Sequence, residues 1–196
     1  MTPLENILRF VDLLNRYRNV ERGVFVNKQN RLENDVEHSY QLAMLAWFLV
    51  DSEKLSLDSG LILKYALVHD LVEAYAGDTF AFANGDLKKE KIEKEHRARE
   101  RLKKEFPELR ELNKLISNYE AGKDPESRFI YALDKLQPTL NIYADGGRTW
   151  RKDKVTLQMI IDYKNEKISK IPELKGYFDE LIQTLKQNEK KFFENQ

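Results

Sequence analysis

Residues 61 to 79, LILKYALVHDLVEAYAGDT, constrain what this chain can fold into more than any other stretch. Apolar residues recur there at steps of three and four as far as Gly77, which is placed to end a helix, so the pattern predicts a buried helix. The pattern is interrupted by one imidazole and three carboxylates, those of His69, Asp70, Glu73 and Asp78. Because burying an unpaired charge is costly, these groups must be paired, bonded to a metal, or directed into a cleft.

The pitch of a helix predicts how these groups are presented. At about 3.6 residues per turn, His69 and Glu73 lie one turn apart on the same face, and Asp70 lies about 100° around the axis from His69. One helix would therefore offer an imidazole nitrogen, a carboxylate beside it, and a second carboxylate a turn further on.

Composition narrows the classes of protein. The 196 residues suit one domain with a full-sized core. Lysine plus arginine equals aspartate plus glutamate, at 33 each, so no nucleic acid polymer is expected as a partner. The chain has no cysteine, so a metal site would have to use histidine and carboxylate. The first ten residues do not resemble a signal peptide, and no stretch reaches the roughly 20 apolar residues of a membrane span, so a cytoplasmic protein without membrane contact is expected.

Helical patterns fill most of the remaining chain, and no convincing strand pattern or internal repeat accompanies them. Start signals at Thr2, Asn34 and Asp124 precede three of the expected helices. The expected helices cover residues 3–18, 35–50, 61–77, 87–106, 109–121, 125–145, 153–170 and 174–194, with a loop over 19–34. The stripe expected to be buried in the first helix is Leu4, Ile7, Leu8, Val11 and Leu14. The predicted architecture is an all-α bundle of about seven or eight helices in a single domain.

Two other helices carry polar groups that can join those of the central helix. His38 lies in the first turn of the second helix, and Asp134 interrupts the apolar face of the helix over 125–145, which Pro138 is expected to kink. Two imidazoles and two carboxylates, from His38, His69, Asp70 and Asp134, suit one divalent transition metal such as Mn, Co, Fe, Ni or Zn. The alternative is a buried network that only holds helices together. His96 lies among charges on a polar helix and is expected to be solvated.

The same residues carry a resemblance to a known family. The set His38, His69, Asp70 and Asp134 resembles the metal ligands of the HD-domain metal-dependent phosphohydrolases. The patterns E-x-x-x-x-H, from Glu33 to His38, and H-D-x-x-E-x-x-x-G-D, from His69 to Asp78, resemble the 5′-deoxynucleotidase-like branch. The likeness covers about residues 4–145. It implies an HD-domain helical bundle with a metal core over about 34–145, on which the helices of 153–194 pack.

The resemblance also implies roles for further residues. Glu73 and Asp78 match the catalytic acids that position or activate the attacking water and assist the leaving group. Arg16 lies near a family arginine that contacts the substrate phosphate, a task that suits a guanidinium fork. Tyr17 stands where characterised bacterial members carry a tryptophan linked to deoxyribose preference, and the loop over 19–33 is longer than theirs, so the sugar and base preferences stay open.

The expected function is hydrolysis of (deoxy)nucleoside 5′-monophosphates to nucleoside and phosphate by a metal-dependent phosphomonoesterase. Two alternatives stay open: a phosphohydrolase that acts on a cyclic nucleotide, a triphosphate or an alarmone, and a non-catalytic helical module that binds a ligand. The branch is commonly dimeric, so a homodimer is expected, with Trp47, Phe48 and Trp150 as candidates for either its interface or the core.

Overall fold

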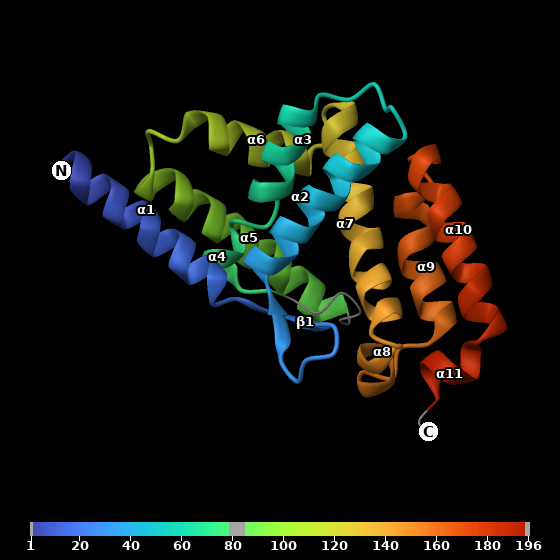
Figure 1. The fold of residues 1–196 in the computed structure, drawn as a ribbon. Helices are drawn as coiled ribbons and strands as arrows, with labels where there is room; N and C mark the ends of the chain where they lie inside the picture. Colours follow the sequence, from blue (N-terminus) through green and yellow to red (C-terminus); the bar gives the residue numbers. More distant parts are fainter. Residues whose placement is uncertain (1, 79–84, 195–196) are drawn as a thin grey trace.

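The computed structural model describes residues 2–78 and 85–194, and helices dominate it (Figure 1). The helices are α1 (Pro3–Arg18), α2 (Asp35–Ser52), α3 (Ser59–Val68), α4 (Glu73–Ala76), α5 (Gly85–Glu105), α6 (Arg110–Glu120), α7 (Pro125–Ala144), α8 (Arg148–Lys152), α9 (Leu157–Ile168), α10 (Pro172–Gln187) and α11 (Glu189–Phe193). Two short strands, β1 (Glu21–Phe25) and β2 (Leu32–Asn34), pair in an antiparallel hairpin. The all-α class is confirmed. The helices outnumber the seven or eight expected, because the helices expected over 61–77 and 174–194 are each divided in two and the short helix α8 is additional.

The predicted helix starts are present and show why these helices begin where they do. Thr2 and Asn34 each accept a hydrogen bond from the backbone N–H three residues on, and Glu5 and Glu37 close the two capping boxes. Asp124 caps α7 in the same way, with Pro125 in the first turn. The cap at Asn34 places His38 in the first turn of α2.

Helix α7 is the centre of the bundle. It contacts α2, α3 and α6 on one side and α9 and α10 on the other, and in Figure 1 it stands between these two groups. Its buried residues include Phe129, Ile130 and Leu133, which join the main core with α2, α3, α9 and α10. A smaller apolar cluster joins α1 to α5 and includes Leu13, Leu71 and Leu102. The helix continues through Pro138, which cannot donate to the carbonyl of Asp134.

The helix expected over 61–77 is not continuous, and this prediction was wrong. Helix α3 ends at Val68, and α4 begins at Glu73 after a turn. Across the break the backbone forms hydrogen bonds between residues three apart instead of four. They run from Leu71 N to Val68 O at 3.2 Å and from Glu73 N to Asp70 O at 2.8 Å. His69 and Asp70 therefore lie in a turn rather than along a straight helix.

Two further expectations were wrong. The segment 19–34, expected to be a loop, contains the hairpin, in which Glu21 lies opposite Asn34 and Phe25 lies opposite Leu32. The stripe expected to be buried on α1 is exposed instead: Leu4 64%, Ile7 61%, Leu8 57%, Val11 45% and Leu14 43%. Helix α1 buries Leu13 and Tyr17 on its other face, and its N-terminal end projects from the bundle in Figure 1. The described part of the chain contains no helix with the length and apolarity of a membrane span.

Candidate metal centre and active site

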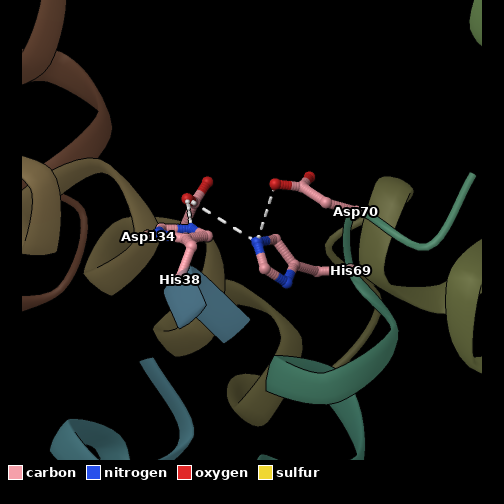
Figure 2. Close-up of side chains that lie close together, drawn as sticks. All are labelled: His38, His69, Asp70 and Asp134. Atoms are coloured by element: carbon pink, nitrogen blue, oxygen red, sulfur yellow. Dashed lines mark hydrogen bonds and ion pairs between the residues drawn. The ribbon is translucent and has the colours of Figure 1, made fainter. Parts of the chain in front are cut away.

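Four polar side chains from distant parts of the chain meet at one point (Figure 2). His38 comes from α2, His69 and Asp70 from the turn after α3, and Asp134 from α7. His38 Nε2 lies 3.0 Å from Asp134 Oδ1, and His69 Nε2 lies 3.0 Å from Asp70 Oδ2 and 3.7 Å from Asp134 Oδ1. Both imidazoles and Asp134 are buried. The break between α3 and α4 turns His69 and Asp70 toward the other two.

The orientation of His69 leaves one ring nitrogen available. Its Nδ1 lies 2.9 Å from the backbone carbonyl of Ala66, so Nδ1 carries the hydrogen and donates it. In the neutral imidazole, Nε2 then presents a lone pair toward two carboxylate oxygens, and it is a buried nitrogen without a hydrogen-bond partner among the described residues. Three electron-rich atoms that face one another attract positive charge, either a metal ion or the proton that the two carboxylates favour on His69.

The shifted pKa values of the site residues also indicate that negative charge is concentrated at this point. Burial alone would lower the pKa of His69, but Asp70 and Asp134 outweigh it and raise the pKa to about 10. Burial and the nearby Arg22 together lower the pKa of His38 to about 4, although Asp134 opposes the change. Burial would raise the pKa of Asp70, but His69 and Arg22 hold it well below its usual range. The carboxylates therefore stay ionised and attract positive charge to this point.

The donor set fits a divalent cation. One ligand atom from each of His38, His69, Asp70 and Asp134 lies within 4.8 Å of every other, as expected for atoms that share an ion at bond lengths of about 2.0–2.2 Å. Asp35, Asp70 and Glu73 form a second such group that shares Asp70. The arrangement can hold a metal beside further acidic groups.

Arg22, on β1, supplies the counter-charge on one side of the site. Its Nη1 donates to Asp35 Oδ1 and to Asp70 Oδ2, both at 3.0 Å, and its Nε lies 4.0 Å from Glu33 Oε2. Burial would lower the pKa of Arg22, but Asp70 and other carboxylates raise it, so the guanidinium stays charged. The hairpin thus brings a fixed positive group to the edge of the metal centre.

A pocket opens next to the four potential ligands, and both predicted catalytic acids line it. Asp70, Asp134, Glu73 and Asp78 contribute carboxylates to its wall. Its cationic side chains are Arg22, Lys91, Lys135 and Lys164. Lys91 Nζ lies 3.4 Å from Glu73 Oε1, and Lys135 Nζ lies 2.6 Å from Asp134 Oδ2. Burial, Asp70 and Asp78 raise the pKa of Glu73 well above its ordinary value, so Glu73 can hold a proton here.

The structure does not bring Arg16 and Tyr17 to this pocket. Arg16 pairs with Asp12 at 2.8 Å and lines a different hollow with Tyr75 and Glu105. Tyr17 is 3% exposed, and its hydroxyl lies 2.7 Å from Ser39 Oγ. His96 is exposed on α5, away from the four potential ligands.

Sequence reasoning missed the cationic side of the site. Arg22 lies in the segment 19–34, where a strand of five residues is too short to show a reliable alternation. Lys135 follows Asp134 directly, and this adjacency to a predicted ligand was the one feature of the sequence that could have indicated a cationic residue at the site. Lys91 and Lys164 belong to helices rich in charge, where nothing in the pattern separates a pocket residue from a solvated one.

The fold and the site together are those of an all-α protein with a site for a divalent metal, in which two imidazoles and two carboxylates from two helices and one turn meet beside a pocket. The HD domain family matches residues 14–175, and the chain belongs to that family. The resemblance found in the sequence is thereby confirmed.

Among curated proteins, the chain is similar to those named 5'-deoxynucleotidase HDDC2. It is 30% identical to that of Homo sapiens over 138 residues, which is 69% of this chain and 66% of the human protein. It is 31% identical to that of Xenopus laevis over 139 residues, 69% of this chain and 67% of the relative. These matches span about two thirds of the vertebrate proteins. The 5'-deoxynucleotidase hdd1 of Schizosaccharomyces pombe is 25% identical over 93% of this chain and 91% of its own length.

A solved structure extends the likeness along the chain. A predicted metal-dependent phosphohydrolase from Magnetospirillum magnetotacticum superposes with a TM-score of 0.80 at 29% identity, covering 94% of this chain and 95% of that one. The likeness includes the C-terminal helices, which the motifs in the sequence did not reach.

Proposed function

We propose that this chain is a metal-dependent phosphohydrolase that releases phosphate from (deoxy)nucleoside 5′-monophosphates. The observation on which this proposal depends is that His38, His69, Asp70 and Asp134 meet within 4.8 Å, beside a pocket lined by both cationic and acidic side chains. The names of the curated relatives support the nucleotide substrate, and the likeness to a metal-dependent phosphohydrolase supports the reaction class.

One divalent transition metal, Mn, Co, Fe, Ni or Zn, is the proposed cofactor. Nitrogen ligands from two imidazoles and oxygen ligands from two carboxylates suit any of these ions. The ion, when bound, would polarise a phosphoryl oxygen and make hydroxide available near neutral pH. The hydrogen bond from His69 Nδ1 to Ala66 O would keep Nε2 directed at the ion.

The substrate phosphate would bind between the cationic side chains of the pocket. Arg22 and Lys135 are already hydrogen-bonded to the carboxylates of Asp70 and Asp134, so both lie at the edge of the metal centre. A guanidinium can bond two phosphate oxygens at once, and an ammonium adds a point charge. Arg22 is therefore better placed for this contact than Arg16, which lies outside the pocket.

Glu73 and Asp78 are the proposed catalytic acids. Glu73 would accept the proton of the attacking water, and its 3.4 Å contact with the Lys91 ammonium supplies a counter-charge for the ionised carboxylate that accepts it. Asp78 would orient the water or protonate the departing 5′ oxygen. The products would be a nucleoside and inorganic phosphate.

The test combines two substitutions with metal analysis and a nucleotide panel. Asp70→Ala should abolish both metal content and phosphate release, because it removes a ligand. Glu73→Gln should keep the metal and lower the rate by about a hundredfold or more, the usual size of a general acid–base contribution. Full turnover by Glu73→Gln would show that Glu73 has no role in the mechanism.

The nucleotide panel, run after chelation and metal restoration, separates monophosphates from cyclic nucleotides, triphosphates and alarmones as substrates.

We also propose a homodimer and a cytoplasmic location, with no nucleic acid polymer or membrane as a partner. The apolar stripe of α2 supports the dimer, because five large side chains on one face are exposed: Val36, Tyr40, Met44, Trp47 and Phe48. Trp150 is 2% exposed and belongs to the core rather than to this stripe.

A further inference from the structure

The pocket extends well beyond the metal centre. From Asp134, the same face of α7 continues through Pro138 and Ile142, about 6 Å and about 12 Å further along the helix axis. The wall of this far part, here called the distal compartment, consists mainly of Val24, Pro138, Ile142, Trp150, Val155 and Tyr163. These residues come from β1, α7, α8, α9 and the segment between α8 and α9. The phosphate chemistry proposed above uses none of them.

Two polar groups lie among these apolar walls. Asp153 lines the pocket and is partly exposed, and its carboxylate has no hydrogen bond or ion pair with any side chain in the described ranges. The ammonium of Lys164 is on a residue that is only 7% exposed, and it donates to Lys135 O and to Thr139 Oγ1, both at 2.7 Å. Burial lowers the pKa of Lys164 to about 7, so near neutral pH the neutral amine coexists with the ammonium form, whose third hydrogen remains for a ligand.

Apolar walls with a few polar groups are typical of a small-molecule site. The separation along α7 between Asp134 and Ile142 is comparable to the length of a nucleoside monophosphate from its phosphate to the far edge of its base. A flat base fits between apolar and aromatic side chains, and the polar groups at its edge then decide which base is accepted.

We propose that the distal compartment binds the base of the nucleotide and that Asp153 selects bases with an exocyclic amino group, namely adenine, guanine and cytosine. This inference rests on the proposed nucleotidase function and specifies its substrates. A carboxylate only accepts hydrogen bonds, so it pairs with an amino group. Thymine and uracil offer one ring N–H flanked by two carbonyl oxygens, which repel a carboxylate.

The test compares the metal-loaded wild-type protein with Asp153→Asn, using dAMP, dGMP, dCMP and dTMP. Asn keeps the shape of the side chain, removes its charge and adds a donor. The wild type should prefer the three amino-bearing substrates. Asp153→Asn should lower kcat/KM for those three by about 10- to 100-fold, the usual size of a charged hydrogen bond, and leave the value for dTMP unchanged or higher. Asp162→Asn removes an exposed carboxylate of α9 outside the pocket and should change none of the four values.

A second measurement separates failure of this inference from failure of the proposed function. Equilibrium dialysis with 2′-deoxyguanosine, 2′-deoxycytidine and thymidine reports base binding without any hydrolysis. Phosphate release by the wild type with equal losses for all four substrates in Asp153→Asn would overturn the base contact and leave the nucleotidase intact. Absence of phosphate release would overturn the nucleotidase, and dialysis would then decide the compartment: equal binding of all nucleosides, or none, contradicts the proposal.

Discussion

At the scale of single residues, one arginine supplies the positive charge for several buried carboxylates. Arg22 contacts Asp35 and Asp70 and lies near Glu33, so one guanidinium neutralises several acids at once. Removing it would leave buried carboxylates without a counter-charge, which is strongly destabilising. Arg22 therefore has a structural role in addition to its proposed contact with phosphate.

Glu33 provides a prediction for stability against pH. Its side chain is 3% exposed, and burial raises its pKa from 4.5 to about 7, although Arg22 opposes the change. Between these two values the folded protein binds more protons than the unfolded chain, so the free energy of unfolding falls as pH rises. The loss should be about 3 kcal/mol, since one pKa unit corresponds to about 1.4 kcal/mol.

Urea unfolding of the metal-free protein at pH 5 and pH 8 measures this loss. Glu33→Gln should reduce the difference between the two pH values by about 2–3 kcal/mol. Glu21→Gln, on an exposed side chain of the same hairpin, is the matched control and should keep the wild-type difference. Equal pH dependence in the wild type and Glu33→Gln would show that Glu33 does not titrate in this range.

At the scale of elements, the connection between α7 and α8 packs closely against α11 at the C-terminal end of the described chain. Gly146 and Gly147 both have positive φ, at +68° and +81°, where a side chain is strained. A Cβ on Gly147 would also collide with the main chain of Phe192 in α11, whereas a Cβ on Gly146 would meet nothing within 4 Å. Only Gly147 therefore needs glycine for a close approach as well as for its backbone angle.

Alanine at each glycine separates the cost of backbone strain from the cost of the collision with α11. Gly146→Ala should lower the free energy of unfolding by about 1 kcal/mol, the cost of backbone strain. Gly147→Ala should lower it by about 2–4 kcal/mol, because α11 must also move. Thermal or urea unfolding measures both, and equal losses would contradict the packing of α11 against this turn.

At the scale of the whole molecule, the exposed apolar faces of α1 and α2 have no covering element in the described ranges. A stable interface buries about 800 Å² on each partner, which a helix face of large side chains can supply. A second copy is the proposed partner of the α2 stripe. Serine at both Trp47 and Phe48, which are 50% and 65% exposed, should convert a dimer to a monomer in sedimentation equilibrium.

The control for this prediction is an exposed apolar residue on another helix. Ile92 on α5 is 68% exposed, and Ile92→Ser should leave the assembly unchanged. Because the substituted side chains are already exposed, the variants should fold as the wild type does. A wild-type protein that sediments as a monomer would contradict the proposed homodimer.

The sequence by itself determined the helical class, the helix starts and the residue types available to the metal centre. These follow from contacts within a few residues: side chains such as those of Thr2, Asn34 and Asp124 satisfy backbone groups of their own helices. The His69–Asp70 pair, the acids after it and Asp134 could be recognised because polar groups in apolar helices are conspicuous and because the motif resembles a known family.

Tertiary structure alone decided the break after Val68, the hairpin that presents Arg22, the exposed face of α1 and the walls of the pocket. Each depends on packing between segments far apart in the chain, which local periodicity does not describe. An apolar stripe has the same pattern whether it meets the core, a second copy or solvent, so the pattern on α1 did not predict its exposure. Lysines on α7 and α9 become pocket residues only because those two helices pack together.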